Sequence, residues 1–509
     1  MGNLERSIRY YEMALAINPR FAETLNNLGV IYTLMGRTNE GLQYCKLAIE
    51  ANPNYAEAYN NLGVLFRDEG RIPEAIASYA HCIALKKEAV NAAQNRLLAL
   101  NYAVDFSPVQ IYEEHFKWGR EFSERFTRFP LKPHSNRRIR IGYVSPDLCI
   151  HSVSYFCEAP IRFHDSSKFE VFCYFNLSRE DERTRMFKDL VSLDHWRDIV
   201  ALSTEQVCEI IAGDEIDILV DLTGHTAGNR LDVFAMKPAS VQVTWIGYPN
   251  TTGLPTIDYR IGDAIADAGE CDDRFVEKLV RLPGCFLCYS PPRVYSDVAP
   301  LPSLGTGVVT FGSFNNLAKI SEDVIALWCK ILSRVPESRM LMKCKPFATD
   351  RVRDRFFELF AKFGIPSHRV DLIPLAPKTE DHLALYGHVD IALDSFPYAG
   401  TTTTCEALLM GVPVITLKGE AHAQNVGMSL IKSISLAKLE MYCLCETREQ
   451  YVENAVSLAT CLEDLEEIRK SLRPQMLASS LCDGLTFTKH VESAFLSMLG
   501  RPASDREEL

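Results

Sequence analysis

A 34-residue repeat near the amino terminus constrains the fold of this chain more than any other feature of its sequence. The segment that starts at Phe21 reads FAETLNNLGVIYTLMGRTNEGLQYCKLAIEANPN, and the segment that starts at Tyr55 reads YAEAYNNLGVLFRDEGRIPEAIASYAHCIALKKE. Gly29 and Gly63 stand at the same spacing, and Pro53 separates the two units. Small residues let antiparallel helices approach closely, and a proline ends the second helix before the next unit. The repeat therefore predicts stacked pairs of helices.

The period and the residue types are those of tetratricopeptide repeats, about two and a half of them over residues 1–100. Gly2-Asn3 aligns with the mid-repeat turns at Gly36-Arg37 and Gly70-Arg71, so the sequence begins halfway through a unit. A solenoid end without a polar cap is unusual. We therefore expect further repeats upstream in a longer protein, of which this sequence is a fragment, an incomplete gene model or a shortened form.

Three asparagines recur at the same 34-residue interval: Asn27, Asn61 and Asn95. On one face of a superhelix, their amides form a ladder that can hydrogen-bond an extended peptide without reading its side chains. The alternative is that these amides bond within the repeats or cap helices. The ladder predicts that acceptor proteins bind along the arm.

The composition excludes several classes of protein. At 509 residues the chain is too long for one ordinary domain, and its net charge of −12 argues against a general nucleic-acid binder. It has no apolar stretch of the length that spans a membrane. The sixteen cysteines lie in apolar runs and predict reduced, buried thiols in a cytosolic or nuclear protein. Cys285 and Cys288 form a lone C-x-x-C without a second pair at zinc spacing, so we expect no metal site.

Beyond the repeats, residues 101–137 predict a helical linker, and strands then alternate with helices. IRIGYVSPD, FEVFCYF, IDILVDLTG, VQVTWIGY and DYRIGD predict the strands of a first α/β lobe over residues 138–303. VVTFGSF, RMLMKCK, RVDLIPL, DIALDSF and VPVITL predict those of a second lobe over residues 304–500, before a polar tail at 501–509. Two such series predict two Rossmann-like, doubly wound sheets with ligand in the crevice between them. The glycine motifs of dehydrogenases and P-loop NTPases are absent from the sequence, which disfavours both classes.

The segment DSFPYAGTTTTCEALLMGVP carries the sharpest chemical signal. A strand ends at a turn with Gly400, and Thr401, Thr402, Thr403 and Thr404 open a helix. A helix amino terminus offers unpaired N–H groups and positive dipole charge, so hydroxyls there predict a diphosphate cradle. The alternative is capping of the helix by one threonine. Glu406, one turn further on, either accepts hydrogen bonds from ribose hydroxyls or complements the helix dipole.

A second candidate site lies in VTFGSFNNLAKI. A strand, a turn and then Lys319 place a cation at the carboxyl edge of the second sheet, where it can neutralise a leaving diphosphate. Asn315 or Asn316 is expected to fix sugar or phosphate oxygens. The alternative is that Lys319 is a solvated surface charge.

Two histidines of the first lobe follow predicted strands. His151 lies just beyond the first strand, and His225 lies in the equivalent place after LVDLTG. A loop histidine at a sheet's carboxyl edge can be a general base or a sugar ligand, and the alternative is a structural histidine. The nearby run TWIGYPNTTGLPTIDY either walls an acceptor cleft or packs the sheet edge.

The strings SPDLCIHSVSYF, LTGHTAGN, QVTWIGYPNTTGLPTIDYRI, FGSFNNLAKI, FPYAGTTTTCEALLMGVP and HAQNVGMSLI make the chain resemble the SPINDLY branch of the O-GlcNAc transferase family over residues 1–500. The resemblance implies a GT-B fold and an inverting, metal-independent glycosyltransferase that needs no cofactor. It also implies that His151, Lys319 and the threonine turn lie at the donor site. Lys378 and His382 stand where the O-GlcNAc branch contacts its nucleotide, although the spacing here is one residue longer.

Two departures from the O-GlcNAc branch bear on the donor. That branch shows H-P-T-S-H where this chain has HSVSY, and G-H-T-T-G-M-D where it has GTTTTCE. Both departures fall on the side of SPINDLY, whose members resemble protein O-fucosyltransferases that use GDP-fucose. The alternative donor is UDP-GlcNAc. By the same resemblance, plant members act in the nucleus and cytoplasm and restrain gibberellin signalling.

The expected reaction is displacement at the anomeric carbon by a Ser or Thr hydroxyl of an acceptor protein, with His151 as first choice for the base. His225 or a donor phosphate oxygen is the alternative base. The expected partners are a nucleotide sugar and proteins held along the arm, with oligomerisation through the repeats left open. A rival from another class is a tetratricopeptide scaffold that carries a weak transferase body.

Overall fold

The computed structural model describes residues 2–131, 137–269, 271–376 and 378–501. The chain divides into two compact units. The first comprises Met1–Phe106, Pro302–His382 and His388–Tyr398, and the second comprises Ser107–Leu301, Leu383–Gly387 and Ala399–Leu509. The first unit thus contains the repeat arm and part of the lobe expected over residues 304–500. The remainder of that lobe belongs to the second unit, together with the lobe expected over residues 138–303. Of the polar tail expected at 501–509, only the first residue is among those described.

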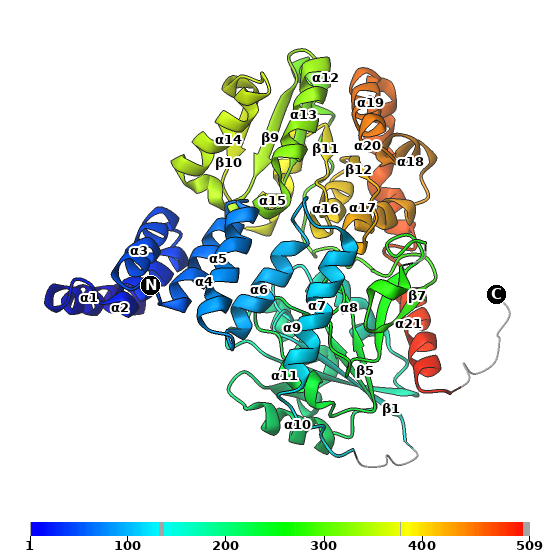
Figure 1. Ribbon diagram of the computed structural model, residues 1–509. Helices are drawn as coiled ribbons and strands as arrows, with labels where there is room; N and C mark the ends of the chain where they lie inside the picture. Colours follow the sequence, from blue (N-terminus) through cyan, green and yellow to red (C-terminus); the bar gives the residue numbers. More distant parts are fainter. Residues whose placement is uncertain (1, 132–136, 270, 377, 502–509) are drawn as a thin grey trace. The chain divides into compact units, whose positions relative to one another are not determined.

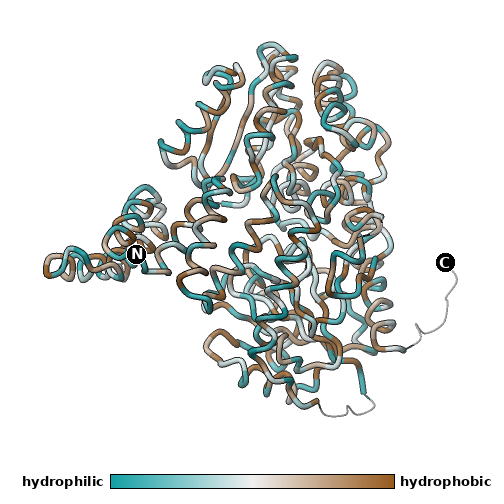
Figure 2. The backbone as a smooth tube through the Cα atoms, in the orientation of Figure 1, coloured by the Kyte–Doolittle hydropathy of each residue, from teal (hydrophilic) through white to brown (hydrophobic). Residues whose placement is uncertain are grey.

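The amino-terminal part of the first unit is an array of helices in which consecutive members pack side by side (Figure 1). These helices are α1 (Gly2–Ile17), α2 (Ala22–Leu34), α3 (Thr38–Ala51), α4 (Ala56–Asp68), α5 (Ile72–Leu85) and α6 (Val90–Leu100). Hydrophobic and hydrophilic residues alternate along each of them (Figure 2), as expected for helices that bury one face. The repeat pattern read from the sequence is therefore confirmed.

The close approach expected at the repeat glycines is present between α4 and α5. A Cβ atom added at Gly63 would lie 2.5 Å from the ring of Tyr79, which is fully buried. A larger residue at Gly63 would have to push the two helices apart, because protein interiors are close-packed.

The other part of the first unit is a parallel sheet of strand order β10-β9-β8-β11. Its strands are β8 (Thr310–Ser313), β9 (Arg339–Lys343), β10 (Val370–Ile373) and β11 (Ile391–Leu393), and its helices are α12 (Pro302–Thr306), α13 (Glu322–Arg334), α14 (Asp350–Lys362) and α15 (Thr379–Ala384). All four strands match segments predicted from the sequence. The order reverses between β8 and β11, and ligands of doubly wound sheets bind at such a switch point.

An ion cluster joins the arm to this part of the same unit. The Glu69 carboxylate, after α4, is 2% exposed and accepts from both terminal nitrogens of Arg351 on α14. The Arg351 guanidinium also donates to Asn39 Oδ1 at 2.9 Å, and Arg355 donates to the Glu69 carbonyl. A buried carboxylate needs such partners, because an unpaired charge out of water is costly.

The second unit contains a seven-stranded parallel sheet of order β3-β2-β1-β4-β5-β6-β7. Its strands are β1 (Ile139–Ser145), β2 (Phe169–Phe175), β3 (Trp196–Asp198), β4 (Ile218–Asp221), β5 (Val241–Thr244), β6 (Tyr259–Asp263) and β7 (Lys278–Leu282). The five strands predicted from runs of β-branched and aromatic residues are present, and β3 and β7 were not predicted. The switch point lies between β1 and β4, the two strands that precede His151 and His225.

In addition to this sheet, the second unit contains helices and the strands β12 (Val414–Leu417) and β13 (Leu444–Cys445), which pair in parallel. The helices are α7 (Pro108–Ser123), α8 (Ser154–Phe163), α9 (Glu182–Val191), α10 (Thr204–Gly213), α11 (Leu231–Met236), α16 (Thr402–Leu409), α17 (His422–Lys432), α18 (Ala437–Cys443), α19 (Arg448–Thr460), α20 (Leu462–Ala478) and α21 (Gly484–Met498). Helix α7 lies within the linker expected at 101–137, and Ser107 and Gln110 form a capping box at its start.

All sixteen cysteines are free thiols, twelve buried and four half-buried, as the sequence predicted. Over the part of the chain that the structure describes, no helix is both long and apolar enough to cross a membrane.

The Glu69 cluster gives a stability prediction. Glu69→Ala should lower the free energy of unfolding of the first unit by about 1–3 kcal/mol, because it leaves the Arg351 guanidinium without its buried carboxylate partner. Urea denaturation measures the change. Glu40→Ala, which removes the exposed pair with Arg37 on α3, is the control and should cost under about 0.5 kcal/mol. Equal losses in the two variants would contradict the assigned role.

Candidate functional site

Lys319 lies at the carboxyl edge of the first unit's sheet, as predicted. It ends the 3₁₀ turn η3 (Leu317–Lys319), which follows β8. Its Nζ lies 4.1 Å from the centre of the Tyr398 ring. Burial lowers the pKa of Lys319 to about 8, and the Asp394 carboxylate opposes that shift. The lysine is therefore a partly desolvated cation rather than the solvated surface charge of the alternative.

The two asparagines of the same loop have different surroundings. Asn315 is buried, and its Nδ2 lies 3.5 Å from both Ser313 Oγ and Asp394 Oδ1. Asn316 is exposed, and its Oδ1 caps η3 by accepting from the Ala318 N–H at 3.1 Å. Asn316 thus shapes the backbone that presents Lys319, and ligation of sugar or phosphate oxygens by either amide stays a prediction.

His382, on α15, lies beside a cation that the sequence did not single out. Its Nδ1 bonds to Nζ of Lys343, the last residue of β9, and Lys343 is 4% exposed. Lys343 Nζ also lies 5.2 Å from the centre of the Phe314 ring. Lys378 is exposed ahead of α15. The first unit therefore places a second lysine, Lys343, at the same sheet edge as Lys319.

In the second unit, the four threonines open helix α16 as predicted. The N-cap residue Thr401 makes no side-chain capping bond, so the capping alternative does not account for it. The hydroxyl of Thr402 is buried and has no hydrogen-bond partner in the structure. Gly400 is buried directly before the turn. Because a buried hydroxyl without a partner is costly, the Thr402 hydroxyl could donate to a ligand oxygen, and the diphosphate cradle at this helix terminus stays a prediction.

Glu406 faces a group of tyrosines within the same unit. The Tyr386 hydroxyl lies within reach of the Glu406 carboxylate and donates to the Thr403 carbonyl at 3.1 Å. Burial and then this carboxylate raise the pKa of Tyr386 well above its usual value. Glu406 also raises the pKa of Tyr155 on α8, after burial and against Arg183. Because α8 follows the His151 turn, the second unit brings that turn and α16 into the same neighbourhood.

The two histidines after strands differ in accessibility. The His151 side chain is 47% exposed, and its Nδ1 lies 3.4 Å from Asp147 Oδ1. Burial of the Asp147 carboxyl raises the pKa of Asp147. A group that accepts a proton from a substrate needs such access.

His225 is only 1% exposed, and its Nε2 donates to the Thr252 carbonyl at 2.8 Å. His115, Trp118 and Tyr248 surround its ring at centroid distances of 4.6–5.3 Å. Burial, and then His115, hold the pKa of His225 well below its usual range. His225 Nδ1 is buried and has no hydrogen-bond partner in the structure, and the choice between a catalytic and a structural histidine stays a prediction.

Two of the repeat asparagines, Asn61 and Asn95, donate to asparagines that lie next to the ladder in the preceding repeat. Asn61 Nδ2 donates to Asn26 Oδ1 at 2.8 Å, and Asn95 Nδ2 donates to Asn60 Oδ1 at 3.1 Å. Both bonds link successive repeats, whereas the alternative considered for the ladder was bonding within one repeat or helix capping. Asn27, Asn61 and Asn95 are all half-buried, and their binding to an acceptor stays a prediction.

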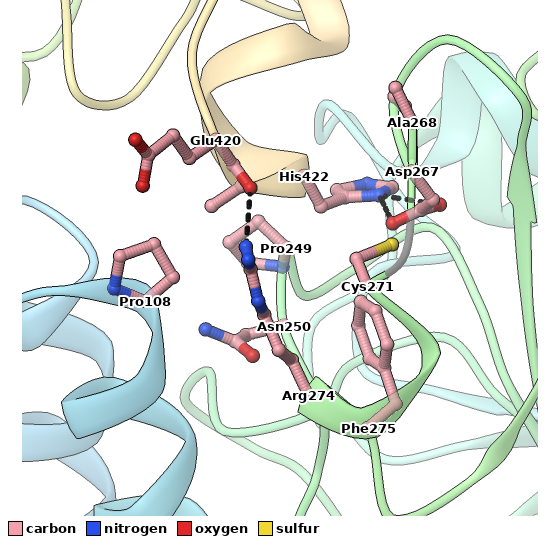
Figure 3. Close-up of a pocket in the computed structure, with 12 residues that line it drawn as sticks. Pro108, Pro249, Asn250, Asp267, Ala268, Cys271, Arg274, Phe275, Glu420 and His422 are labelled. Atoms are coloured by element: carbon pink, nitrogen blue, oxygen red, sulfur yellow. Dashed lines mark hydrogen bonds and ion pairs between the residues drawn. The ribbon is translucent and has the colours of Figure 1, made fainter.

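A solvent-open hollow of about 370 Å³ lies within the second unit (Figure 3). Pro249 and Asn250, from the run expected to wall an acceptor cleft, line it together with Arg274, which donates to the Glu420 carbonyl at 2.8 Å. A buried pair forms another wall, with His422 Nδ1 2.9 Å from Asp267 Oδ1. Among the described residues, no group of three or more His, Cys, Asp or Glu side chains is placed to hold a metal ion.

Comparison with known proteins bears on this geometry. The sequence model of glycosyl transferase family 41 matches residues 122–297 and 301–491, and a tetratricopeptide-repeat model matches residues 20–88. A mutant of the O-GlcNAc transferase of Thermobaculum terrenum superposes with a TM-score of 0.91 and 34% identity, over 98% of this chain and 94% of that one.

Two curated relatives are informative. The chain is 49% identical over 416 residues to a Solanum lycopersicum protein named probable UDP-N-acetylglucosamine–peptide N-acetylglucosaminyltransferase SPINDLY, covering 81% of this chain and 44% of the relative. It is 31% identical over 420 residues to the Arabidopsis thaliana protein of that probable activity named SEC, covering 79% and 42%. The chain thus spans about half the length of the curated relatives that it matches.

Helical repeats followed by Rossmann-like parallel sheets give the chain a tetratricopeptide arm and a GT-B-like fold. The chain belongs to glycosyl transferase family 41 and is similar to its SPINDLY members.

The different surroundings of the two histidines predict different costs of removal. His225→Ala should lower the free energy of unfolding of the second unit by about 2–4 kcal/mol, because it empties an aromatic core site. His151→Ala is the matched variant and should change it by less than about 0.5 kcal/mol. Urea denaturation followed by tryptophan fluorescence reports the loss, since Trp118 lies 4.6 Å from the His225 ring. Similar stability of the two variants would show that His225 is not a packing residue.

Proposed function

We propose that this chain transfers fucose from GDP-fucose to Ser and Thr hydroxyls of proteins, with inversion at the anomeric carbon and without a metal ion. The observation that carries the proposal is Lys319, a partly desolvated cation on a turn at the carboxyl edge of a parallel sheet. Such a cation suits a diphosphate, because its attraction grows as negative charge develops on the leaving group.

The proposed donor contacts are those expected from the sequence, namely Lys319, Asn315, Asn316, Lys378, His382, Gly400, Thr401, Thr402, Thr403, Thr404 and Glu406. Hydrogen bonds to a charged group contribute roughly 1.5–3 kcal/mol each. Lysine and three or four hydroxyl or N–H donors therefore supply roughly 6–15 kcal/mol, a range that includes the ~8 kcal/mol at the lower end of what enzymes provide. The partnerless hydroxyl of Thr402 supports this assignment.

The proposed base is His151. The acceptor oxygen forms a bond to the anomeric carbon, the bond from that carbon to the diphosphate oxygen breaks, and GDP leaves. The hydroxyl proton passes to the imidazole of His151, whose exposure leaves it accessible to an acceptor. A donor phosphate oxygen is the alternative acceptor of the proton.

The choice of fucose rests on the branch of the family. The chain is 49% identical to a SPINDLY relative and 31% identical to SEC, and SPINDLY members resemble enzymes that use GDP-fucose. UDP-GlcNAc is the alternative donor, and it is the donor in the names of both relatives.

The proposed acceptors are nuclear and cytoplasmic proteins held along the repeat arm. The resemblance to SPINDLY extends the proposal to repressor proteins of gibberellin signalling. A tetratricopeptide scaffold with weak catalysis is the competing proposal, and calorimetry with GDP separates the two, because a scaffold has no need of the nucleotide.

A two-donor assay tests the sugar. The chain is incubated with an acceptor protein and either GDP-fucose or UDP-GlcNAc, and the product is weighed by mass spectrometry. We expect a mass increase of one deoxyhexose with GDP-fucose and no increase with UDP-GlcNAc. Addition of N-acetylhexosamine alone would overturn the donor assignment and leave the glycosyltransferase assignment intact.

The pKa of Lys319 predicts how nucleotide binding depends on pH. The protonated lysine binds the diphosphate, and its pKa in the free chain is about 8. Affinity for GDP should therefore be greatest below that pH and fall roughly tenfold from about pH 8 to about pH 9.5 as the charge is lost. Lys319→Arg keeps its charge throughout and should flatten the profile in calorimetry. An unchanged profile in that variant would exclude Lys319 as the titrating group.

A further inference from the structure

The repeat arm reaches Lys319 within the first unit. From this contact we infer that Tyr102 and Tyr398 are positioning residues for Lys319, so that the arm takes part in setting up the donor site. The inference rests on the proposed function, because the position of Lys319 matters for transfer only if Lys319 binds the donor diphosphate. It differs from the arm's expected use as a reader of acceptor proteins.

Tyr398 forms a platform for the lysine. It follows β11 and presents its ring to Lys319, with Nζ 4.1 Å from the ring centre. An ammonium over the face of an aromatic ring is attracted by the ring's quadrupole. A lysine side chain otherwise samples many rotamers, so the ring face limits where the cation can lie. Asp394, on the same loop, adds an opposite charge that favours the protonated form.

Tyr102 supports this platform from the arm. It lies just beyond the carboxyl end of α6, and its ring stacks on Tyr398 with centroids 4.9 Å apart and planes 25° apart. Burial raises the pKa of Tyr102 to about 12, although Arg67 opposes the shift, so its hydroxyl stays neutral. Tyr102, directly after the last repeat helix, thus packs against the Tyr398 ring that Lys319 contacts.

A second contact meets the backbone that carries the lysine. Gly70 has φ +75° in the turn between α4 and α5, and a Cβ atom added there would lie 2.5 Å from the Leu317 carbonyl oxygen. Leu317 begins the 3₁₀ turn that Lys319 ends. Glu69, the preceding residue, carries the ion cluster with Arg351 described above. The arm therefore touches both the backbone turn and the ring platform of Lys319.

The equivalent turn of the previous repeat supplies a matched control. Gly36 has φ +79°, and a Cβ atom added there would have no atom within 4 Å. Gly36→Ala and Gly70→Ala therefore carry the same cost of a left-handed alanine, but only Gly70→Ala presses on Leu317.

The first experiment measures transfer to a short peptide acceptor, so that the grip of the arm on an acceptor protein contributes little. The variants are Tyr398→Leu and Tyr102→Leu, with Tyr398→Phe and Tyr102→Phe as conservative partners that keep the rings. We expect kcat to fall about tenfold in each Leu variant with the peptide KM unchanged, and to stay near wild type in each Phe variant. Gly70→Ala should lower kcat and Gly36→Ala should not. Leu variants with wild-type kcat, or equal losses in both glycine variants, would overturn the inference.

A second readout does not depend on turnover. The lysines are reductively methylated with ¹³C, and the signal of Lys319, identified by its loss in Lys319→Arg, is titrated by NMR. Leucine keeps the site apolar but lacks the ring face, so Tyr398→Leu should move the midpoint to lower pH, and Tyr398→Phe should restore it. An unmoved midpoint in Tyr398→Leu would also overturn the inference. Absence of transfer by the wild-type chain from either donor, with these shifts present, would instead reject the proposed function alone.

Discussion

The first unit is organised around a cation held partly out of water. Lys319 sits where β8 ends, and burial there opposes its charge. Asp394 and the Tyr398 ring, both from the loop after β11, favour the charged form. Since β8 and β11 flank the point where the strand order reverses, the sheet topology itself brings these three groups together. Burial thus lowers the pKa of Lys319, while Asp394 and the ring limit the loss of its charge and the ring limits where the ammonium lies.

Two other buried carboxylates have basic partners. Glu69 has Arg351, and Asp267 has His422 at 2.9 Å in the second unit. The amino terminus of α16 is handled differently, because Thr401 does not cap it and the Thr402 hydroxyl lacks a partner. A folded chain tolerates unsatisfied donors where a ligand completes them. The incomplete helix terminus is the feature of the second unit that the proposed nucleotide-sugar donor would complete.

Much of this arrangement was predictable from sequence, because it depends on local pattern. The 34-residue period gave the helices of the arm, and runs of β-branched and aromatic residues gave most strands of both sheets. The strands β3 and β7 were missed, since WRD and KLVRL are interrupted by charges. Lys319 and the α16 threonines were found because each directly follows a strand.

What was not predictable depends on contacts between distant segments. His151 and His225 follow strands in the same way, but α7 covers only His225 in an aromatic cluster, which no local spacing reveals. The partners of Asn61 and Asn95 are asparagines one position away from the ladder in the preceding repeat. Tyr102 and Tyr398 lie far apart in sequence, and nothing near either residue indicates that they stack.

The central claim is that Lys319 holds the diphosphate of a nucleotide-sugar donor, and a crystal structure with bound GDP tests it most directly. The account predicts that a diphosphate oxygen lies within hydrogen-bonding distance of Lys319 Nζ. A nucleotide whose diphosphate lies away from Lys319, for example in the hollow lined by Arg274 and His422, would contradict it.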